Sequence, residues 1–304
     1  MAMTTTSSNR LFALLSTASL VMWWPAISAT LALTLHQDAY THIFLVLPVS
    51  GALIVLSWRK QDWKPRSDFR AGSLLLSLAV LVALSGLRWG NPNILTGDIR
   101  LALEMLALVI WWIGSFVGCF GDRIARACIF PLLFLFWLIP LPELALHRIE
   151  LLLQQGSTSF ARLLLMTTGV PVAREGTTLS VPGLTLQVAQ ECSSIRSSTL
   201  LVVISVLLSH LFLRSTWARL FVVLVSLPLS IAKNGVRIFT LAVLGAYWDR
   251  GILDSPLHHQ GGILFLALAL ATVVILTSLL ARLEARASAH QFPHSSAEVI
   301  SARQ

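Results

Sequence analysis

The chain consists of long apolar stretches separated by short polar connections. Eight such stretches can be read from the sequence, at residues 11–34, 41–58, 71–88, 100–120, 124–145, 197–213, 217–247 and 260–281. A helix needs roughly 20 mostly apolar residues to cross a bilayer. The pattern therefore predicts an all-α membrane protein, a polytopic bundle of about eight transmembrane helices. The first stretch is longer than the apolar core of a secretory signal and many others follow it, so we interpret it as a helix of the bundle.

Cationic residues gather in every second connection. Arg10 precedes the first stretch, and the other cations of this set follow the second, fourth, sixth and eighth: Arg59, Lys60, Lys64, Arg66, Arg70, Arg123, Arg126, Arg214, Arg219, Arg282 and Arg286. Cytoplasmic connections of membrane proteins are enriched in lysine and arginine. We therefore expect a multi-pass membrane protein with both termini in the cytoplasm; for a bacterial protein this membrane is the cytoplasmic (inner) membrane. The opposite connections, which hold fewer cations for their length, are expected on the extracytoplasmic side: 35–40, 89–99, 146–196 and 248–259.

The connection at 146–196 is the longest of these. Residues 147–168 mix leucines with glutamine, serine and arginine, a pattern typical of an amphipathic helix lying in the membrane interface. Alternating apolar residues between 177 and 189, interrupted by Pro182-Gly183, predict a small hairpin that leads to Cys192. We expect residues 1–285 to form one polytopic membrane domain and residues 286–304, which are polar and rich in alanine and serine, to be a disordered cytoplasmic tail.

The composition agrees with this interpretation. Of the 304 residues, 56% are hydrophobic and only 12% are charged, whereas soluble domains carry about 25% charged residues. The net charge of +8 does not indicate nucleic-acid binding, because the cations lie in connections rather than in a basic stripe interleaved with aromatic residues. The sequence contains no Walker, GxGxxG, HExxH or CxxC motif, so we expect neither a cofactor nor a metal.

Cys192 is the cysteine with the most polar surroundings. The other two, Cys119 and Cys128, fall at predicted cytoplasmic ends of helices, so no disulfide partner is expected on the extracytoplasmic side. A helix N-terminus and a nearby cation both favour the thiolate, and Arg196, four residues on, shares its helical face. The carboxylate of Glu191, next to Cys192, disfavours the thiolate. We interpret Cys192 as a candidate nucleophile; the alternative is a small apolar filler, since unpaired cysteine is often buried.

Arg237 lies inside the seventh apolar stretch, in the sequence Asn234-Gly235-Val236-Arg237. Charges within a spanning helix are costly and usually face a cavity or a partner. Arg237 follows Arg219 by 18 residues, or about 27 Å at 1.5 Å per residue, which places it toward the extracytoplasmic end. The alternatives are a snorkelling arginine or a structural ion pair, for which Glu104 in the fourth stretch is the candidate partner.

His258 and His259 precede the eighth stretch, on the side predicted for Cys192 and Arg237. Either imidazole could act as a base, and the alternative is an ordinary histidine in an interfacial loop. A thiol, an imidazole and a guanidinium are the parts of a nucleophile, a base and an oxyanion stabiliser. Because the charge pattern brings all three to one side, we favour an enzyme at a membrane surface, with Arg196, Asn234, His259 and Glu104 as supporting or alternative residues.

These motifs resemble the exosortase/archaeosortase family of membrane cysteine transpeptidases. Residues 191–197 are similar to the family block Ala-Cys-Ser-Gly-(Ile/Leu)-Arg-Ser, and residues 234–238 form the second motif. His258 is followed by Gly262 and Phe265 at the family's spacing, which His259 does not match. Residues 131–142 and 169–172 also look like family landmarks, and the resemblance covers about 128–280. Ser194 and Glu191 depart from the usual glycine and alanine.

The resemblance implies Cys192 as nucleophile, Arg237 as transition-state stabiliser and His258 as acid and base. It also implies substrates: exported proteins that end in a short motif of the Pro-Glu-Pro (PEP-CTERM) type, a transmembrane helix and a basic tail. Bacterial members are associated with exopolysaccharide loci, so the bilayer, such exported proteins and exopolysaccharide machinery are the partners it suggests. The expected reaction is cleavage through a thioester, with transfer to a surface acceptor or to water.

Two other functions remain open from the residues themselves. A non-enzymatic transporter or polysaccharide-export component would use Arg237, Lys233 and Glu104 as substrate or ion contacts, although no internal repeat of the kind common in transporters is visible. The second alternative function is an intramembrane protease of another class. Its aspartyl form is disfavoured, because every aspartate falls in a connection.

Overall fold

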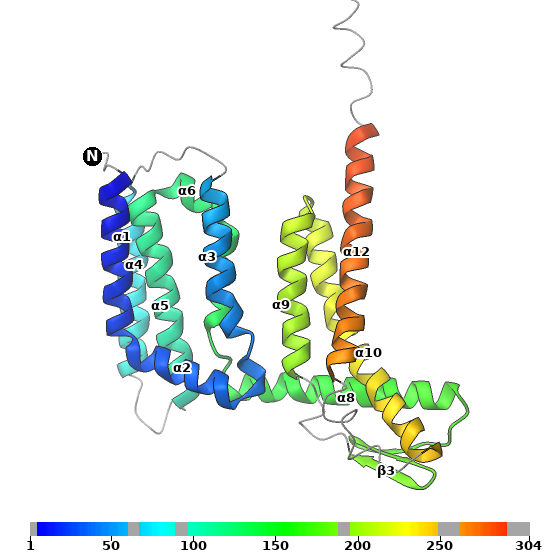
Figure 1. Cartoon of the computed structure of the whole chain (residues 1–304). Helices are drawn as coiled ribbons and strands as arrows, with labels where there is room; N and C mark the ends of the chain where they lie inside the picture. Colours follow the sequence, from blue (N-terminus) through cyan, green and yellow to red (C-terminus); the bar gives the residue numbers. More distant parts are fainter. Residues whose placement is uncertain (1–4, 60–66, 89–96, 188–194, 249–261, 291–304) are drawn as a thin grey trace, which may run out of the picture. The chain divides into compact units, whose positions relative to one another are not determined.

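A computed structural model of the chain describes residues 5–59, 67–88, 97–187, 195–248 and 262–290. Almost all of these residues are helical, and three short strands form one small sheet. The chain divides into two compact units, Met1–Arg148 and Ile149–Gln304. Each unit is a set of helices with its own core (Figure 1).

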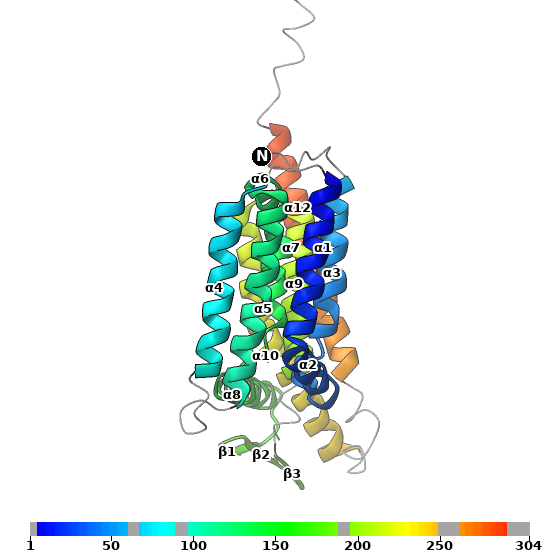
Figure 2. The same ribbon diagram turned by 90° about the vertical axis from the view of Figure 1, so that its left-hand side faces the viewer.

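The first unit is built from the N-terminal helices. They are α1 (Thr5–Met22), α2 (Trp24–His36), the short 3₁₀ helix η1 (Asp38–Tyr40), α3 (Ile43–Arg59), α4 (Phe69–Arg88), α5 (Gly97–Phe120), α6 (Asp122–Ala127), α7 (Ile129–Phe134) and the 3₁₀ turn η2 (Leu135–Leu138). Helices α1, α3, α4 and α5 run side by side, and α2 lies across their ends (Figure 2).

Two predicted apolar stretches are bent rather than straight. The first breaks at Trp23, where α1 and α2 meet at 71°. Pro25 accounts for the restart, because proline suits the first turn of a new helix and lacks the N–H that a continuous helix would need there. The second break follows Leu138, where Pro140 and Pro142 separate residues 129–138 from the next helix at 94°. The predicted stretch 124–145 is therefore shorter as a helix than its hydropathy indicated.

Helices α4 and α5 approach closely through glycines. A Cβ at Gly72 would lie 2.5 Å from the Cα of Gly118, and one at Gly114 would lie 2.9 Å from the Cβ of Leu75. Such contacts let two backbones pack without side chains between them, which is a common way for membrane helices to associate.

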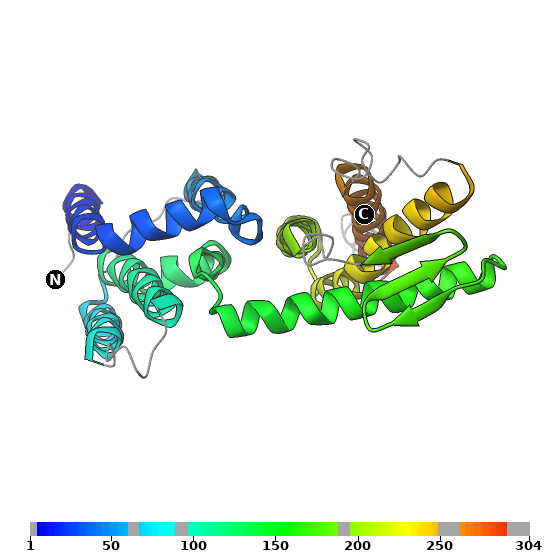
Figure 3. The same cartoon turned by 90° about the horizontal axis from the view of Figure 1, so that it is seen from below.

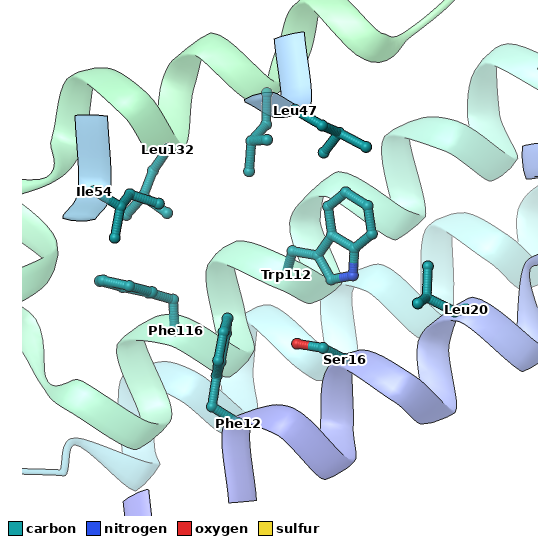
Figure 4. Close-up of a pocket in the computed structure, with 9 residues that line it drawn as sticks. Phe12, Ser16, Leu20, Leu47, Ile54, Trp112, Phe116 and Leu132 are labelled. Atoms are coloured by element: carbon teal, nitrogen blue, oxygen red, sulfur yellow. The ribbon is translucent and has the colours of Figure 1, made fainter. Parts of the chain in front are cut away.

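An aromatic cluster forms the other contact surface of α5. The rings of Phe12, Trp58, Phe116 and Phe120 lie edge-on or tilted, with centroids 4.9–5.9 Å apart, a favourable arrangement for aromatic pairs. Next to this cluster is an apolar cavity of about 220 Å³ between α1, α3, α5 and α7 (Figure 4). Apart from Ser16, the labelled side chains that line this cavity are apolar or aromatic. The aromatic cluster and this lining show that the helices around α5 pack mainly through apolar side chains.

The second unit is built from the C-terminal helices. They are α8 (Glu143–Thr167), which begins in the first unit, α9 (Ile195–Phe212), α10 (Thr216–Tyr247) and α12 (Gly262–His290). Helices α9, α10 and α12 pack against one another around Leu201, Leu213, Val222, Ala269 and Val273. Helix α12 continues to His290, a few residues past the position where the polar tail was predicted to start.

A small antiparallel sheet follows α8. Its strands are β1 (Ala173–Glu175), β2 (Thr178–Val181) and β3 (Leu184–Gln187), in the order β1-β2-β3. Strands β2 and β3 turn at Pro182-Gly183, with Gly183 at φ 75°, and β1 is an additional strand that the alternation did not predict. Leu179 and Val181 pack on Leu165, Ile238 and Ala242, so the sheet is held on α8 and the C-terminal half of α10 (Figure 3).

In each unit the cations predicted to be cytoplasmic lie at one end of the helices. In the first unit these are Arg10, Arg59, Arg70, Arg123 and Arg126. In the second unit they flank the turn between α9 and α10 and the end of α12. There the carboxylate of Glu284 accepts hydrogen bonds from the backbone N–H groups of Arg214 (2.8 Å) and Ser215 (3.0 Å), which satisfies donors at the start of α10.

Within the described residues, six helices are long and apolar enough to cross a membrane, or up to eight if each bent pair counts as one span. Many large apolar side chains on their outer faces are exposed, as expected for surfaces that face lipid rather than water. The chain is thus an all-α, multi-pass membrane protein. Which end of the helices faces the cytoplasm stays a prediction, and so does the extracytoplasmic position of α8 and the sheet.

Candidate functional site

Helix α10 carries a short polar segment within an apolar helix. Lys233, Asn234 and Arg237 occupy little more than one turn, and the helix runs unbroken through them from Thr216 to Tyr247. Lys233 is 7% exposed and Asn234 is 1% exposed, while Arg237 is half-buried. Burying such groups inside a spanning segment is costly, so their neighbours are informative.

Lys233 connects α10 to the first turn of α9. Its Nζ donates a hydrogen bond to the Oγ of Ser197, the third residue of α9. The adjacent Ser198 is buried, at 5% exposed. The bond therefore fixes the polar segment of α10 beside the residues that follow the Glu-Cys-Ser-Ser block.

Arg237 lies one turn further along α10, at the start of α12. A Cβ built at Gly262 would be 3.9 Å from the Nη1 atom of Arg237, so the guanidinium lies against the first residue of α12. Gly262 follows His258 by four residues. A guanidinium carries several N–H donors in a planar fork, and here it lies where two helices meet at one end of the unit.

The glycine between these residues has a packing role. A Cβ at Gly235 would lie 2.7 Å from Cδ1 and 2.9 Å from Cβ of Phe160, and 3.1 Å from the carbonyl oxygen of Ser157. Only a residue without a side chain lets α8 approach α10 this closely. Gly235 therefore holds α8 against the polar segment, and α10 stays continuous at this position.

Asn234 has unusual surroundings for a carboxamide. Among the residues that the structure describes, neither its Oδ1 nor its Nδ2 has a hydrogen-bond partner, and the same is true of the Ser198 Oγ. Leaving a buried polar group unpaired costs about 1–3 kcal/mol. The polar segment thus has hydrogen-bonding capacity that the described part of the chain does not use.

The predicted site residues are placed as follows. Cys192, His258 and His259 lie outside the described residues. Arg196 is exposed on the first turn of α9, and Asn234 and Arg237 lie on α10. Glu104 lies on α5 in the first unit, where it accepts a hydrogen bond from Arg100 at 2.9 Å; its pairing with Arg237 stays a prediction.

Sequence reasoning underestimated two residues. The sequence gives Lys233 a role only in the transporter alternative, and Ser197 appears only as a member of the family block, with no role of its own. The available signal was a lysine inside an apolar stretch one turn before Arg237, on the same helical face. Its partner could not be found from the sequence, because 36 residues separate it from Ser197.

No cluster of three or more metal-ligating side chains occurs in the described ranges. The polar segment of α10 offers hydrogen bonding and positive charge: a guanidinium and an ammonium on one face of the helix, with hydroxyls and a carboxamide beside them. This combination can stabilise developing negative charge on an oxygen atom.

Comparisons with known proteins point to one family. A family model described as transmembrane exosortase matches residues 11–275. The match begins well before residue 128, so the family pattern includes the first unit as well as the motifs of the second. No curated protein and no solved structure matches the chain.

Proposed function

Because this chain belongs to the transmembrane exosortase family, we propose that it cleaves the C-terminal sorting signals of exported proteins by cysteine chemistry. The proposed substrates end in a short motif, a single transmembrane helix and a basic tail. Membership supports a membrane exosortase-type function as such. The cysteine mechanism, the substrates and the extracytoplasmic position of the reaction are our proposal.

One observation carries the proposal: side chains of α10 lie against residues that follow Cys192 and His258 closely in the sequence. Lys233 bonds Ser197, which follows Cys192 by five residues, and Arg237 lies against Gly262, which follows His258 by four. A chain extends by at most about 3.6 Å per residue. Five residues of chain therefore span at most about 18 Å, and four residues span at most about 14 Å. This limit supports, at the same end of the second unit, a site that contains all three groups.

In the proposed reaction, the thiolate of Cys192 attacks the scissile carbonyl carbon, and the C=O π electrons move onto the oxygen. The guanidinium of Arg237 donates hydrogen bonds to this oxyanion. When the intermediate collapses, the C–N bond breaks, His258 protonates the departing amine, and a thioester to Cys192 remains. A water molecule or an amine on a surface acceptor then attacks the thioester, His258 takes its proton, and the thiolate leaves.

The test uses a reporter protein that carries a Pro-Glu-Pro motif, one transmembrane helix and a basic tail, incubated with the purified enzyme in lipid nanodiscs. Cys192→Ala should give no detectable cleaved product while the protein still inserts in membranes, because the nucleophile is lost. The matched control is Cys119→Ala with Cys128→Ala, which removes the two buried thiols of the first unit and should retain cleavage.

Mass spectrometry of the wild-type protein should find the reporter fragment attached to the peptide that contains Cys192. Full processing by Cys192→Ala would overturn the proposal. It would favour a non-enzymatic role, as a transporter or export component.

A further inference from the structure

A buried ammonium that the proposed mechanism does not use lies beside Arg237. Lys233 is only 7% exposed, and the hydrogen bond that the structure gives its Nζ is to the neutral hydroxyl of Ser197. A hydroxyl compensates only in part for the loss of water around a cation. An apolar side chain of similar length would therefore fit this position at a lower cost to folding.

The position of Arg237 adds to this cost. Residues four apart in a helix share a face, and like charges at that spacing repel each other. The chain thus keeps two cations on one face of α10, where a single cation would be more favourable for stability. A requirement other than stability would account for this arrangement.

The contacts indicate what that requirement is. Three helices meet at this end of the second unit, and each is held to α10 next to the cations. Lys233 holds α9 through Ser197, Arg237 lies against α12 at Gly262, and Gly235 admits Phe160 of α8. The Lys233–Ser197 bond is a side-chain hydrogen bond that joins the first turn of α9 to the turn of α10 that ends at Arg237.

We propose that Lys233 is a positioning residue, whose bond to Ser197 sets the distance between the start of α9 and the guanidinium of Arg237. This inference rests on the proposed function, in which the chain just before α9 supplies the nucleophile and Arg237 stabilises the oxyanion. Lys233 itself does not contact the substrate. It acts by keeping two other groups at the separation that the transition state needs.

The principal test is Lys233→Met, which keeps most of the side-chain volume and removes the cation. Misplacement of reacting groups by about 1 Å can reduce rates about 100-fold, so we expect kcat for the Pro-Glu-Pro reporter to fall about 10- to 100-fold. KM should change by less than about twofold, since substrate binding elsewhere is unaffected. Thermal unfolding should occur at the same or a higher temperature than in the wild type, because a buried charge is removed.

Ser197→Ala is the second variant, because it removes the acceptor and leaves the cation in place. We expect a smaller decrease in kcat in the same direction. The double variant should be no slower than Lys233→Met alone, because both substitutions break one interaction. Arg219→Met is the matched control: it removes an α10 cation at the other end, whose guanidinium bonds the carbonyl of Leu213, and kcat should stay near the wild-type value.

A wild-type kcat in both Lys233→Met and Ser197→Ala would overturn the inference, and so would independent, additive effects of the two substitutions. A lower unfolding temperature with unchanged kcat would also overturn it, since that is the result of a purely structural role. These outcomes are distinct from failure of the proposed function. If the proposed function were wrong, Cys192→Ala would still process the reporter, whatever the effect of the Lys233 substitution.

Discussion

The two units of this protein bury different kinds of polar group. In the first unit the buried polar side chains of the described residues are hydroxyls and the imidazole of His42. Ser19 and Thr34 bond carbonyls of their own helices, and Ser50 bonds the carbonyl of Pro131. In the second unit α10 buries an ammonium and a carboxamide, and the carboxamide has no partner among the described residues.

This difference in buried polar groups suggests that the two units have different roles. Hydroxyls that bond a carbonyl of their own helix cost little in a membrane, so the buried polar residues of the first unit are compatible with a purely structural role. A buried lysine and a buried asparagine are expensive. The comparison therefore supports the proposal that the chemistry lies in the second unit, with packing as the main contribution of the first. Three substitutions, in order of decreasing expected effect, can break or sharpen this assignment.

The largest effect is expected at Arg237. Replacing it with Met should lower processing of the Pro-Glu-Pro reporter about 100- to 1000-fold, the usual loss when one oxyanion donor is removed, while membrane insertion is retained. Arg237→Lys should restore little activity, because lysine keeps the charge but not the planar fork of donors. Rates are measured in nanodiscs.

The control for Arg237 is Arg100→Met in the first unit, where the guanidinium is 48% exposed and pairs with Glu104. It should leave the rate within about twofold of the wild type, since exposed ion pairs contribute about 0–1 kcal/mol. Equal losses in the two variants would contradict the division of tasks between the units.

An intermediate effect is expected at Gly72, on stability and not on the chemical step. The new Cβ of Gly72→Ala would lie 2.5 Å from the Cα of Gly118, so α4 and α5 must separate, at a cost of about 1–3 kcal/mol. Thermal unfolding in detergent should occur at a lower temperature, and activity per folded molecule should be unchanged.

Gly51→Ala serves as the control for Gly72, because nothing lies within 4 Å of its Cβ position and alanine favours helix. If the two alanine variants unfold at the same temperature, the close contact between Gly72 and Gly118 does not contribute to the stability of the first unit.

The smallest effect is expected at Glu104. Its ion pair with Arg100 is an i,i+4 pair near the end of a helix, which contributes about 0.3–0.5 kcal/mol. Glu104→Gln should therefore change stability by less than about 1 kcal/mol and should not change activity. A loss of activity close to that of Arg237→Met would instead support the alternative in which Glu104 is the partner of Arg237.

Hydropathy predicted much of the fold because lipid imposes a simple requirement: a span must be helical and apolar over about 20 residues. The stretches at 41–58, 71–88, 100–120, 197–213 and 217–247 correspond closely to α3, α4, α5, α9 and α10. The bends at Trp23 and after Leu138 were not predicted. The prolines that cause them are visible in the sequence, but hydropathy averages over them.

The sequence by itself determined the family, the membrane class and the identity of the candidate groups, because these depend on residue types and short spacings. Only the tertiary structure decided which side chains of α10 meet which helices. Lys233 bonds Ser197, and Arg237 lies against Gly262. These contacts depend on how α8, α9 and α12 pack around Gly235 and the apolar face of α10, and close packing is a property of the whole unit that no local pattern encodes.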